Sequence, residues 1–134
     1  LTDEGHIVVT VGGGGIPVVK REGKLYGTPA VIDKDFASEK LAELIDADKL
    51  VILTAVEKVA INVRKENEEW LSSLTPERAR ALSAEGHFAP GSMLPKVTAC
   101  IEFAESKPGR EAIITSLDKA LQALNGETGT VIKK

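Results

Sequence analysis

Cysteine, clusters of basic residues and long apolar runs are all scarce or absent in this sequence, and each scarcity argues against a class of protein. The only cysteine, Cys100, cannot form an internal disulfide, which indicates a reducing, cytoplasmic setting. The net charge of -3 and the lack of a Lys/Arg tract argue against a general nucleic-acid binder. No run approaches the ~20 consecutive apolar residues of a membrane helix, and no secretory leader opens the chain. We therefore expect a soluble protein that is neither exported nor membrane-bound.

The 134 residues, of which 43% are hydrophobic and 28% charged, suit a single globular domain spanning 1–134. Chains of this length bury roughly two-thirds of the surface that their unfolded form exposes, so folding requires no disulfide or structural metal.

Short apolar runs alternate with segments of helical periodicity along the chain. The runs lie at 7–11, 50–54, 112–115 and 130–132, and the helical segments at 36–45, 94–104 and 118–124. Runs that are apolar on both faces are typical of parallel strands covered by helices on either side. The pattern predicts an α/β fold, a three-layer α-β-α arrangement around a mainly parallel sheet.

Two segments interrupt this alternation. Residues 17–30 carry Gly23 and Gly27 among polar residues, which favours a β-hairpin or a loop. Residues 65–85 are charged, with Thr75 and Pro76 predicted to start a helix. This second segment is either a small helical lid or a solvated surface insertion, and Trp70 within it is expected to cap a local cluster.

A run of four glycines follows the first apolar run. Gly12, Gly13, Gly14 and Gly15 could let backbone N–H groups approach an anionic ligand. The run matches neither the GxGxxG fingerprint nor a Walker A motif. It is therefore either a structural turn or a ligand loop.

Two lysines stand where helices are predicted to begin. Asp33 suits the N-cap of one helix and Ser92 that of another, and Lys34 and Lys96 fall in the respective first turns. A cation there faces the positive end of the helix dipole, unless it reaches an anion that the same amides help to hold. If both helices begin at one edge of the sheet, both ammonium groups converge beside Asp35, as expected for a polyphosphate site. The alternative is that both lysines point to water.

The remaining reactive residue types suggest no further site. His6 and His87 have no partner at metal-ligand spacing, so we expect no side-chain metal site. Cys100 lies among apolar residues of a predicted helix and is expected in the core.

Five strings closely resemble carbamate kinases of the amino acid kinase family, and the resemblance runs almost end to end. They are GGGGIP (12–17), AVIDKDFAS (30–38), IDADKLVILTAVEKVAIN (45–62), GHFAPGSMLPKV (86–97) and REAIITSL (110–117). The elements IDKDFAS and APGSMLPK together are highly specific.

The resemblance implies reversible phosphoryl transfer between ATP and carbamate, giving ADP and carbamoyl phosphate in arginine catabolism. It implies that Lys34 contacts the phosphates, Lys96 reaches the transferred group and Asp35 organises both lysines. The nucleotide would be bordered by Thr54, Ala55 and Val56 and by Pro90, Gly91, Ser92 and Met93. The glycines at 12–15 would lie on the acceptor side, and Mg²⁺ would be held mainly through the nucleotide phosphates.

Two departures from the family qualify these expectations. A complete carbamate kinase is more than twice this length, so the chain resembles the C-terminal, nucleotide-binding half of a homodimeric enzyme and is expected to be inactive alone. Val63 stands where an aromatic residue is expected after Ile61 and Asn62. The alternatives are a non-catalytic regulatory or interaction module of the same fold, or a related kinase that acts on another carboxylate.

Overall fold

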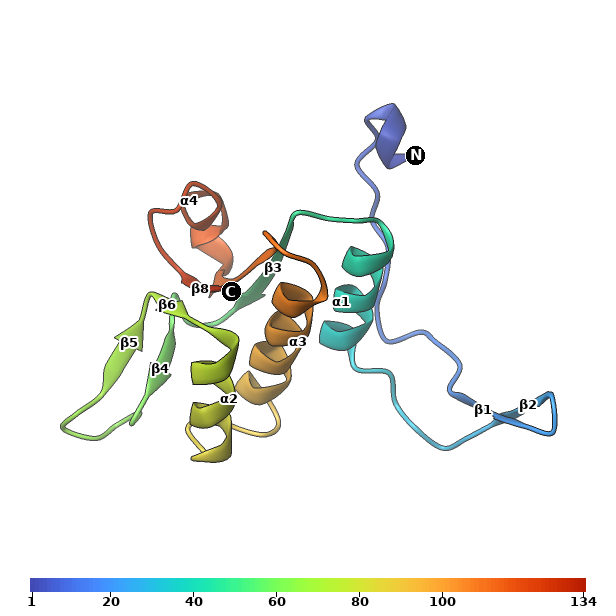
Figure 1. Cartoon of the computed structure of the whole chain (residues 1–134), viewed down its shortest axis with the longest axis horizontal. Helices are drawn as coiled ribbons and strands as arrows, with labels where there is room; N and C mark the ends of the chain where they lie inside the picture. The colour runs from blue at the N-terminus through green and yellow to red at the C-terminus, as the bar shows by residue number, and fades with distance from the viewer.

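A computed structural model describes residues 1–134, the whole chain, and contains four α-helices and eight β-strands (Figure 1). The helices are α1 (Lys34–Leu44), α2 (Pro76–Ala84), α3 (Met93–Ser106) and α4 (Ala120–Leu124), with 3-10 turns at Thr2–Glu4 and Leu117–Lys119. The strands are β1 (Val18–Arg21), β2 (Lys24–Gly27), β3 (Lys49–Thr54), β4 (Val59–Ile61), β5 (Glu69–Leu71), β6 (Ser73–Leu74), β7 (Glu111–Ser116) and β8 (Thr130–Ile132).

Four of the strands form the central sheet, in the order β3-β7-β8-β6. The pairs β3–β7 and β6–β8 are parallel, whereas β7 and β8 are antiparallel. The predicted runs at 50–54, 112–115 and 130–132 are all strands of this sheet. The mainly parallel character is confirmed, and the antiparallel pair is a feature that the apolar runs alone did not indicate.

Helices cover both faces of the sheet, which confirms the three-layer α/β prediction. On one face α1, α3 and α2 lie side by side, while α4 packs against β7 (Figure 1). Side chains alternate along β7, so that Ala112 and Ile114 belong to the core that includes α3. Ile113 instead lies on the α4 side, where Gly129 fits between Ile113 and Ala123; a Cβ added at Gly129 would lie 3.2 Å from Ile113 Cγ2.

The core lies between the sheet and the helical layer of α3 and α2. Phe103, Leu82 and Val97 are completely buried there, together with Ala112 and Ile114 of β7. Cys100 is also buried in this core, as predicted, and burial raises the pKa of its thiol, which keeps the group protonated.

The predicted strand at 7–11 is absent, and this prediction was wrong. Ile7 and Val9 are both 98% exposed, and no backbone hydrogen bond is made by residues 7–16. A strand needs a neighbour that pairs with its N–H and C=O groups, and no strand of the chain lies in register with this run. Its apolar character indicates a tendency to be buried, but no other segment of residues 1–134 buries these side chains.

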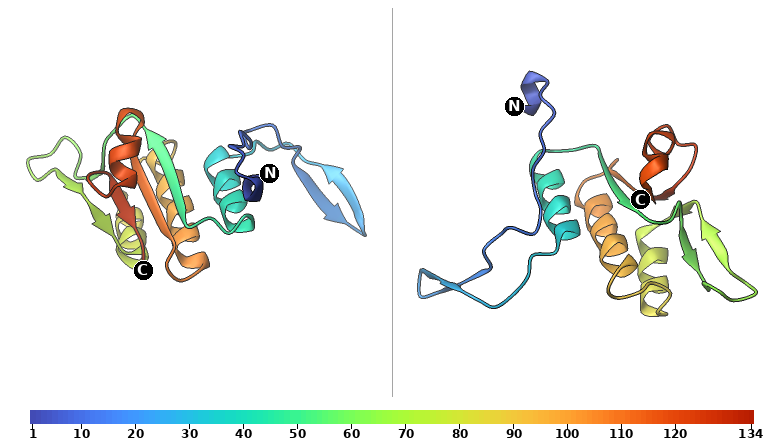
Figure 2. Two further views of the ribbon diagram at one scale, coloured as in Figure 1. Left: turned by 90° about the horizontal axis from the view of Figure 1, so that it is seen from above. Right: turned by 180° about the vertical axis from the view of Figure 1, so that it is seen from behind.

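The predicted excursion at 17–30 is the antiparallel hairpin of β1 and β2, which confirms the hairpin alternative. Its register runs from Val18 opposite Gly27 to Arg21 opposite Lys24. Figure 2 shows the hairpin extending away from the sheet and helices.

The charged segment at 65–85 contains β5, β6 and α2. Thr75 caps α2 as predicted, accepting a hydrogen bond from the Arg78 N–H, and Pro76 is the first helical residue. Ala79 and Leu82 are buried against the core, so α2 is part of the helical layer. A lid role for the remainder of the segment stays a prediction.

The helices are all too short or too polar to cross a lipid bilayer.

The contrast between the buried α3 layer and the exposed run at 7–11 predicts mutational effects of very different size. Phe103→Ala should lower the free energy of unfolding by ~3–5 kcal/mol, because it leaves a cavity in the core. Val9→Ala should change it by less than ~0.5 kcal/mol, because the side chain already faces water. Urea denaturation followed by circular dichroism measures both, and equal effects would contradict this description of the core.

Candidate functional site

The ammonium groups of Lys34 and Lys96 both lie near one carboxylate, that of Asp35. Lys96 Nζ donates to Asp35 Oδ2 at 2.8 Å, and Lys34 Nζ lies 3.9 Å from the same oxygen. The Lys34 side chain is 70% exposed, whereas those of Lys96 and Asp35 are 15% and 10% exposed. The structure therefore joins one outward-facing cation and one half-buried cation through a single buried anion.

This convergence follows from where α1 and α3 begin. The two helices pack side by side, and their first turns lie at the end of the molecule where β3 finishes (Figure 1). Asp33 caps α1 as predicted, its Oδ1 accepting from the Asp35 N–H at 2.8 Å. The cap fixes the first turn of α1 and so holds Asp35 against Lys96 of α3.

The start of α3 differs from those of α1 and α2. Ser92 occupies the N-cap position that the sequence predicts, but its side chain makes no capping hydrogen bond. Pro90, Gly91 and Ser92 are exposed, and Met93 is half-buried. No acidic side chain lies in the first turn, so the positive end of this helix dipole faces Lys96 without a nearby counter-charge on α3 itself.

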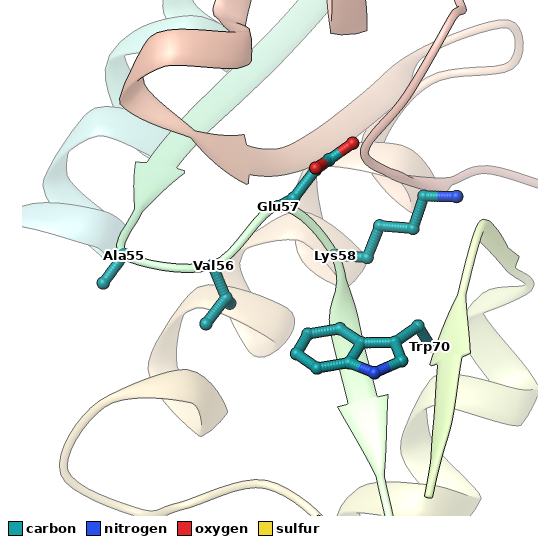
Figure 3. Close-up of a pocket in the computed structure, with 5 residues that line it drawn as sticks. All are labelled: Ala55, Val56, Glu57, Lys58 and Trp70. Carbon is teal, nitrogen blue, oxygen red and sulfur yellow. The ribbon is translucent and has the colours of Figure 1, made fainter.

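A hollow of about 480 Å³ opens just beyond the end of β3 (Figure 3). Its walls are Ala55, Val56, Glu57, Lys58 and Trp70. An adjoining hollow of about 260 Å³ shares Val56, Lys58 and Trp70 and reaches Met93 at the start of α3. The predicted nucleotide-binding residues Ala55, Val56 and Met93 thus line these two hollows. Thr54 ends β3 beside it, and Pro90, Gly91 and Ser92 line neither hollow.

The glycine run lies beside the start of α1. Gly12 lines a cavity of about 300 Å³ together with Lys34 and Asp35, and Gly13 lines a neighbouring cavity of about 320 Å³ that also includes Lys34. Gly15 packs on Ile32, where an added Cβ would lie 2.9 Å from Ile32 Cγ1. The run therefore adjoins the lysine pair, and Gly14 faces open space.

Glu39 lies one turn after Asp35 on α1 and is completely buried. Neither carboxylate oxygen has a hydrogen-bond partner, although Lys40 Nζ is 3.3 Å from Oε2. Burial raises the pKa of Glu39 to about 7, and the neighbouring Glu43 carboxylate adds to the effect. This group was not indicated by the sequence.

The remaining predicted and missed residues are distributed as follows. His6 is exposed and His87 is half-buried, and no group of three or more metal-ligating side chains is present. Trp70, Glu57 and Lys58 line the hollow beyond β3 but were not among the predicted site residues. The available signal was the presence of the one tryptophan in an aromatic-poor chain.

Comparison with known proteins decides the family of this fold and site. The sequence model of the amino acid kinase family matches residues 1–116. The chain belongs to the amino acid kinase family. Among curated relatives, the carbamate kinase-like protein YqeA of Escherichia coli is 61% identical over 132 residues, which are 98% of this chain and 43% of that protein. The carbamate kinase of Clostridium perfringens is 54% identical over 134 residues, 100% of this chain and 43% of that protein.

Solved structures of the family agree with the sequence relatives. The carbamate kinase from Giardia lamblia bound to AMP-PNP superimposes with a TM-score of 0.81 at 46% identity, covering 90% of this chain and 38% of that one. The chain therefore spans about two-fifths of the length of the relatives that it matches.

The buried carboxyl of Glu39 predicts a specific pH dependence of stability. Its pKa in the folded protein lies above the ordinary value of 4.5, so the folded state binds the proton more tightly between pH 4.5 and about 7. Stability from this group is therefore fully present below pH 4.5 and is lost as pH rises to about 7, with a slope of up to about 1.4 kcal/mol per pH unit.

Glu39→Gln removes this titration and keeps the side chain's shape. We expect the variant to gain stability relative to the parent as pH rises from 5 to 8, with little further change above pH 8. Urea denaturation at each pH provides the difference curve, and a flat difference would contradict the burial of a titrating carboxyl.

Proposed function

We propose that this chain is the nucleotide-binding part of a carbamate kinase, which transfers a phosphoryl group reversibly between ATP and carbamate. The observation that carries the proposal is the sharing of Asp35 by the ammonium groups of Lys34 and Lys96. Two relatives that are named carbamate kinase, at 54% and 55% sequence identity to this chain, agree with the proposal. Because the chain spans two-fifths of their length, we propose that these residues alone do not turn over.

The lysine pair supplies the electrostatic part of such a reaction. Phosphoryl transfer spreads negative charge over the oxygens of the moving group, and fixed cations stabilise that charge. Lys34, which is exposed, is proposed to contact the nucleotide phosphates, and Lys96, which is held by Asp35, to contact the transferred group. Asp35 positions both ammonium groups before the substrate arrives, so less reorganisation is needed during transfer.

The two hollows beside the lysine pair are proposed to hold the nucleotide. Ala55, Val56 and Met93 line them, and Thr54, Pro90, Gly91 and Ser92 lie at their borders in the same loops. Gly12, Gly13, Gly14 and Gly15 are proposed to face the acceptor, since the run adjoins the outer side of Lys34. The solved relative with AMP-PNP makes an adenine nucleotide the natural choice.

Mg²⁺ is proposed to be held mainly by the phosphates of the nucleotide. Asp35, the carboxylate nearest to both lysines, already accepts from Lys96, so its charge is engaged. The residues present thus fit a metal that is bound through phosphates, which is common for this ion. The ion would neutralise phosphate charge, while the lysines orient the group.

The wider setting is proposed from the same relatives. A complete protein of this type would be a homodimer in the cytoplasm and would act in arginine catabolism, where carbamoyl phosphate is used to make ATP. The buried, protonated thiol of Cys100 is compatible with a reducing compartment.

The proposal predicts the effect of removing one ammonium group. Lys34→Met should weaken binding of Mg·ADP to this chain at least tenfold, because the cation proposed to contact the nucleotide phosphates is lost. Lys107→Met is the matched control: Lys107 follows the other end of α3 and also pairs with an aspartate, Asp46, but lies far along the helix from the site. Isothermal calorimetry measures both, after circular dichroism has established folding.

Activity provides the second half of the test. In a protein that carries these residues within a chain of its relatives' length, Lys96→Met should lower kcat on the order of 10³-fold or more. ATP formation from carbamoyl phosphate should exceed that from acetyl phosphate.

Two outcomes would contradict the proposal. Absence of heat in calorimetry with millimolar Mg·ADP would refute the nucleotide site, and preference for another carboxylate as acceptor would indicate a different kinase of the family.

A further inference from the structure

Trp70 is the largest exposed side chain at the hollow beyond β3, and it has no role in the proposed phosphoryl transfer. It lies in β5, opposite Ala60 of β4 in the antiparallel register, and is 50% exposed. Figure 3 shows its indole below Val56, with one ring edge directed toward the loop after β3. The small Ala60 opposite leaves the indole free to line both adjoining hollows.

The wall around the indole is mainly apolar. Val56, Ala60, Val63, Ala89 and Met93 contribute to the smaller hollow. Of the two charged side chains of the larger hollow, Lys58 Nζ donates to Ser72 Oγ at 2.9 Å, and Glu57 accepts from Thr128. A flat ligand with an apolar face suits the apolar part of this wall.

The same wall lies next to the proposed phosphate site. Met93 lines the smaller hollow, and Lys96 follows it by three residues within the first turn of α3. A ligand with its base in the hollow would therefore extend its phosphates toward the start of α3, where Lys96 is proposed to contact the transferred group. A nucleotide has this combination of a flat aromatic end and an anionic end.

We propose that Trp70 is the stacking surface for the base of the nucleotide and that it favours purines over pyrimidines. The inference rests on the proposed nucleotide function and adds a binding residue and a base preference to it. A purine has the larger ring system, so it covers more of an indole and gains more from stacking. Trp70 contacts the base only and takes no part in the transfer.

The chain has one tryptophan, so its fluorescence reports on Trp70 directly. Emission should change on titration with Mg·ADP, with a midpoint equal to the dissociation constant from calorimetry. Inorganic pyrophosphate, which has no base, should bind without that change. Mg·CDP should bind at least about fivefold more weakly than Mg·ADP.

Two substitutions separate stacking from general apolar contact. Trp70→Leu should weaken Mg·ADP binding roughly tenfold and leave pyrophosphate binding unchanged, whereas Trp70→Phe should keep most of the affinity. Tyr26→Leu is the matched control, because Tyr26 is 47% exposed on the separate β1–β2 hairpin and should not affect binding.

The outcomes are distinguishable from failure of the proposed function. If calorimetry detects Mg·ADP but Trp70→Leu binds it as tightly as the parent, or the emission stays constant, the role of Trp70 is refuted and the nucleotide site stands. Equal affinity for Mg·CDP refutes the purine preference. If the parent chain binds no nucleotide, both proposals fail. Should Trp70→Leu not fold, the emission titration and the CDP comparison still decide.

Discussion

The ion pair between Lys96 and Asp35 is the contact on which the arrangement of the proposed site depends. It joins the first turns of α1 and α3 at a point where both side chains are largely removed from water. Breaking such a pair by removing one partner costs ~3–5 kcal/mol, because the other charge stays buried. The pair thus fixes the relative position of the two helix starts. Lys34 adds a second ammonium group to the same carboxylate, so Asp35 cannot neutralise both cations.

The formal charges of Lys34 and Lys96 are matched by those of Asp33 and Asp35. The proposed chemistry of the site therefore relies on how the two ammonium groups are aimed and on the positive ends of the helix dipoles. The amides of the first turns and the uncapped start of α3 add to the field of the lysines. Because Asp35 lies against both ammonium groups before an anion binds, the arrangement suits the negative charge that develops on a phosphoryl group in the transition state of its transfer. The hollows lined by Val56 and Met93 lie beside the lysine pair, and they suit the uncharged end of the same ligand.

The helical parts of the site could be predicted from the sequence, and the parts that depend on partners could not. Asp33 and Thr75 were assigned as caps because a short polar side chain before a helix bonds locally, and both do so. The convergence of Lys34 and Lys96 followed from parallel strands that bring helix starts to one edge. The run at 7–11 was predicted to be a strand because it is apolar on both faces, but this character indicates only a tendency to be buried and supplies no strand to pair with.

Other features depended on contacts between residues distant in sequence. The short strands β5 and β6 carry too few residues for a periodic signal, and their partners lie in β4 and β8. Trp70 was expected to cap a local cluster. Its position opposite Ala60 and beside a hollow depends on the pairing of β5 with β4, which its neighbours in sequence do not reveal. Glu39 is buried by the packing of α1 within the fold, so its raised pKa could not be read from its neighbours in sequence.

The central claim is that Lys34 and Lys96 form one site for one anion. Nuclear magnetic resonance of the lysine side chains, with assignments made by single substitutions, tests it most directly during titration with Mg·AMP-PNP, which carries a group in the place of the transferred phosphoryl. The Lys34 and Lys96 ammonium signals should shift together with a single midpoint, while that of Lys107 stays constant. Shifts with different midpoints, or a shift at only one of the two lysines, would contradict the claim that they share a ligand.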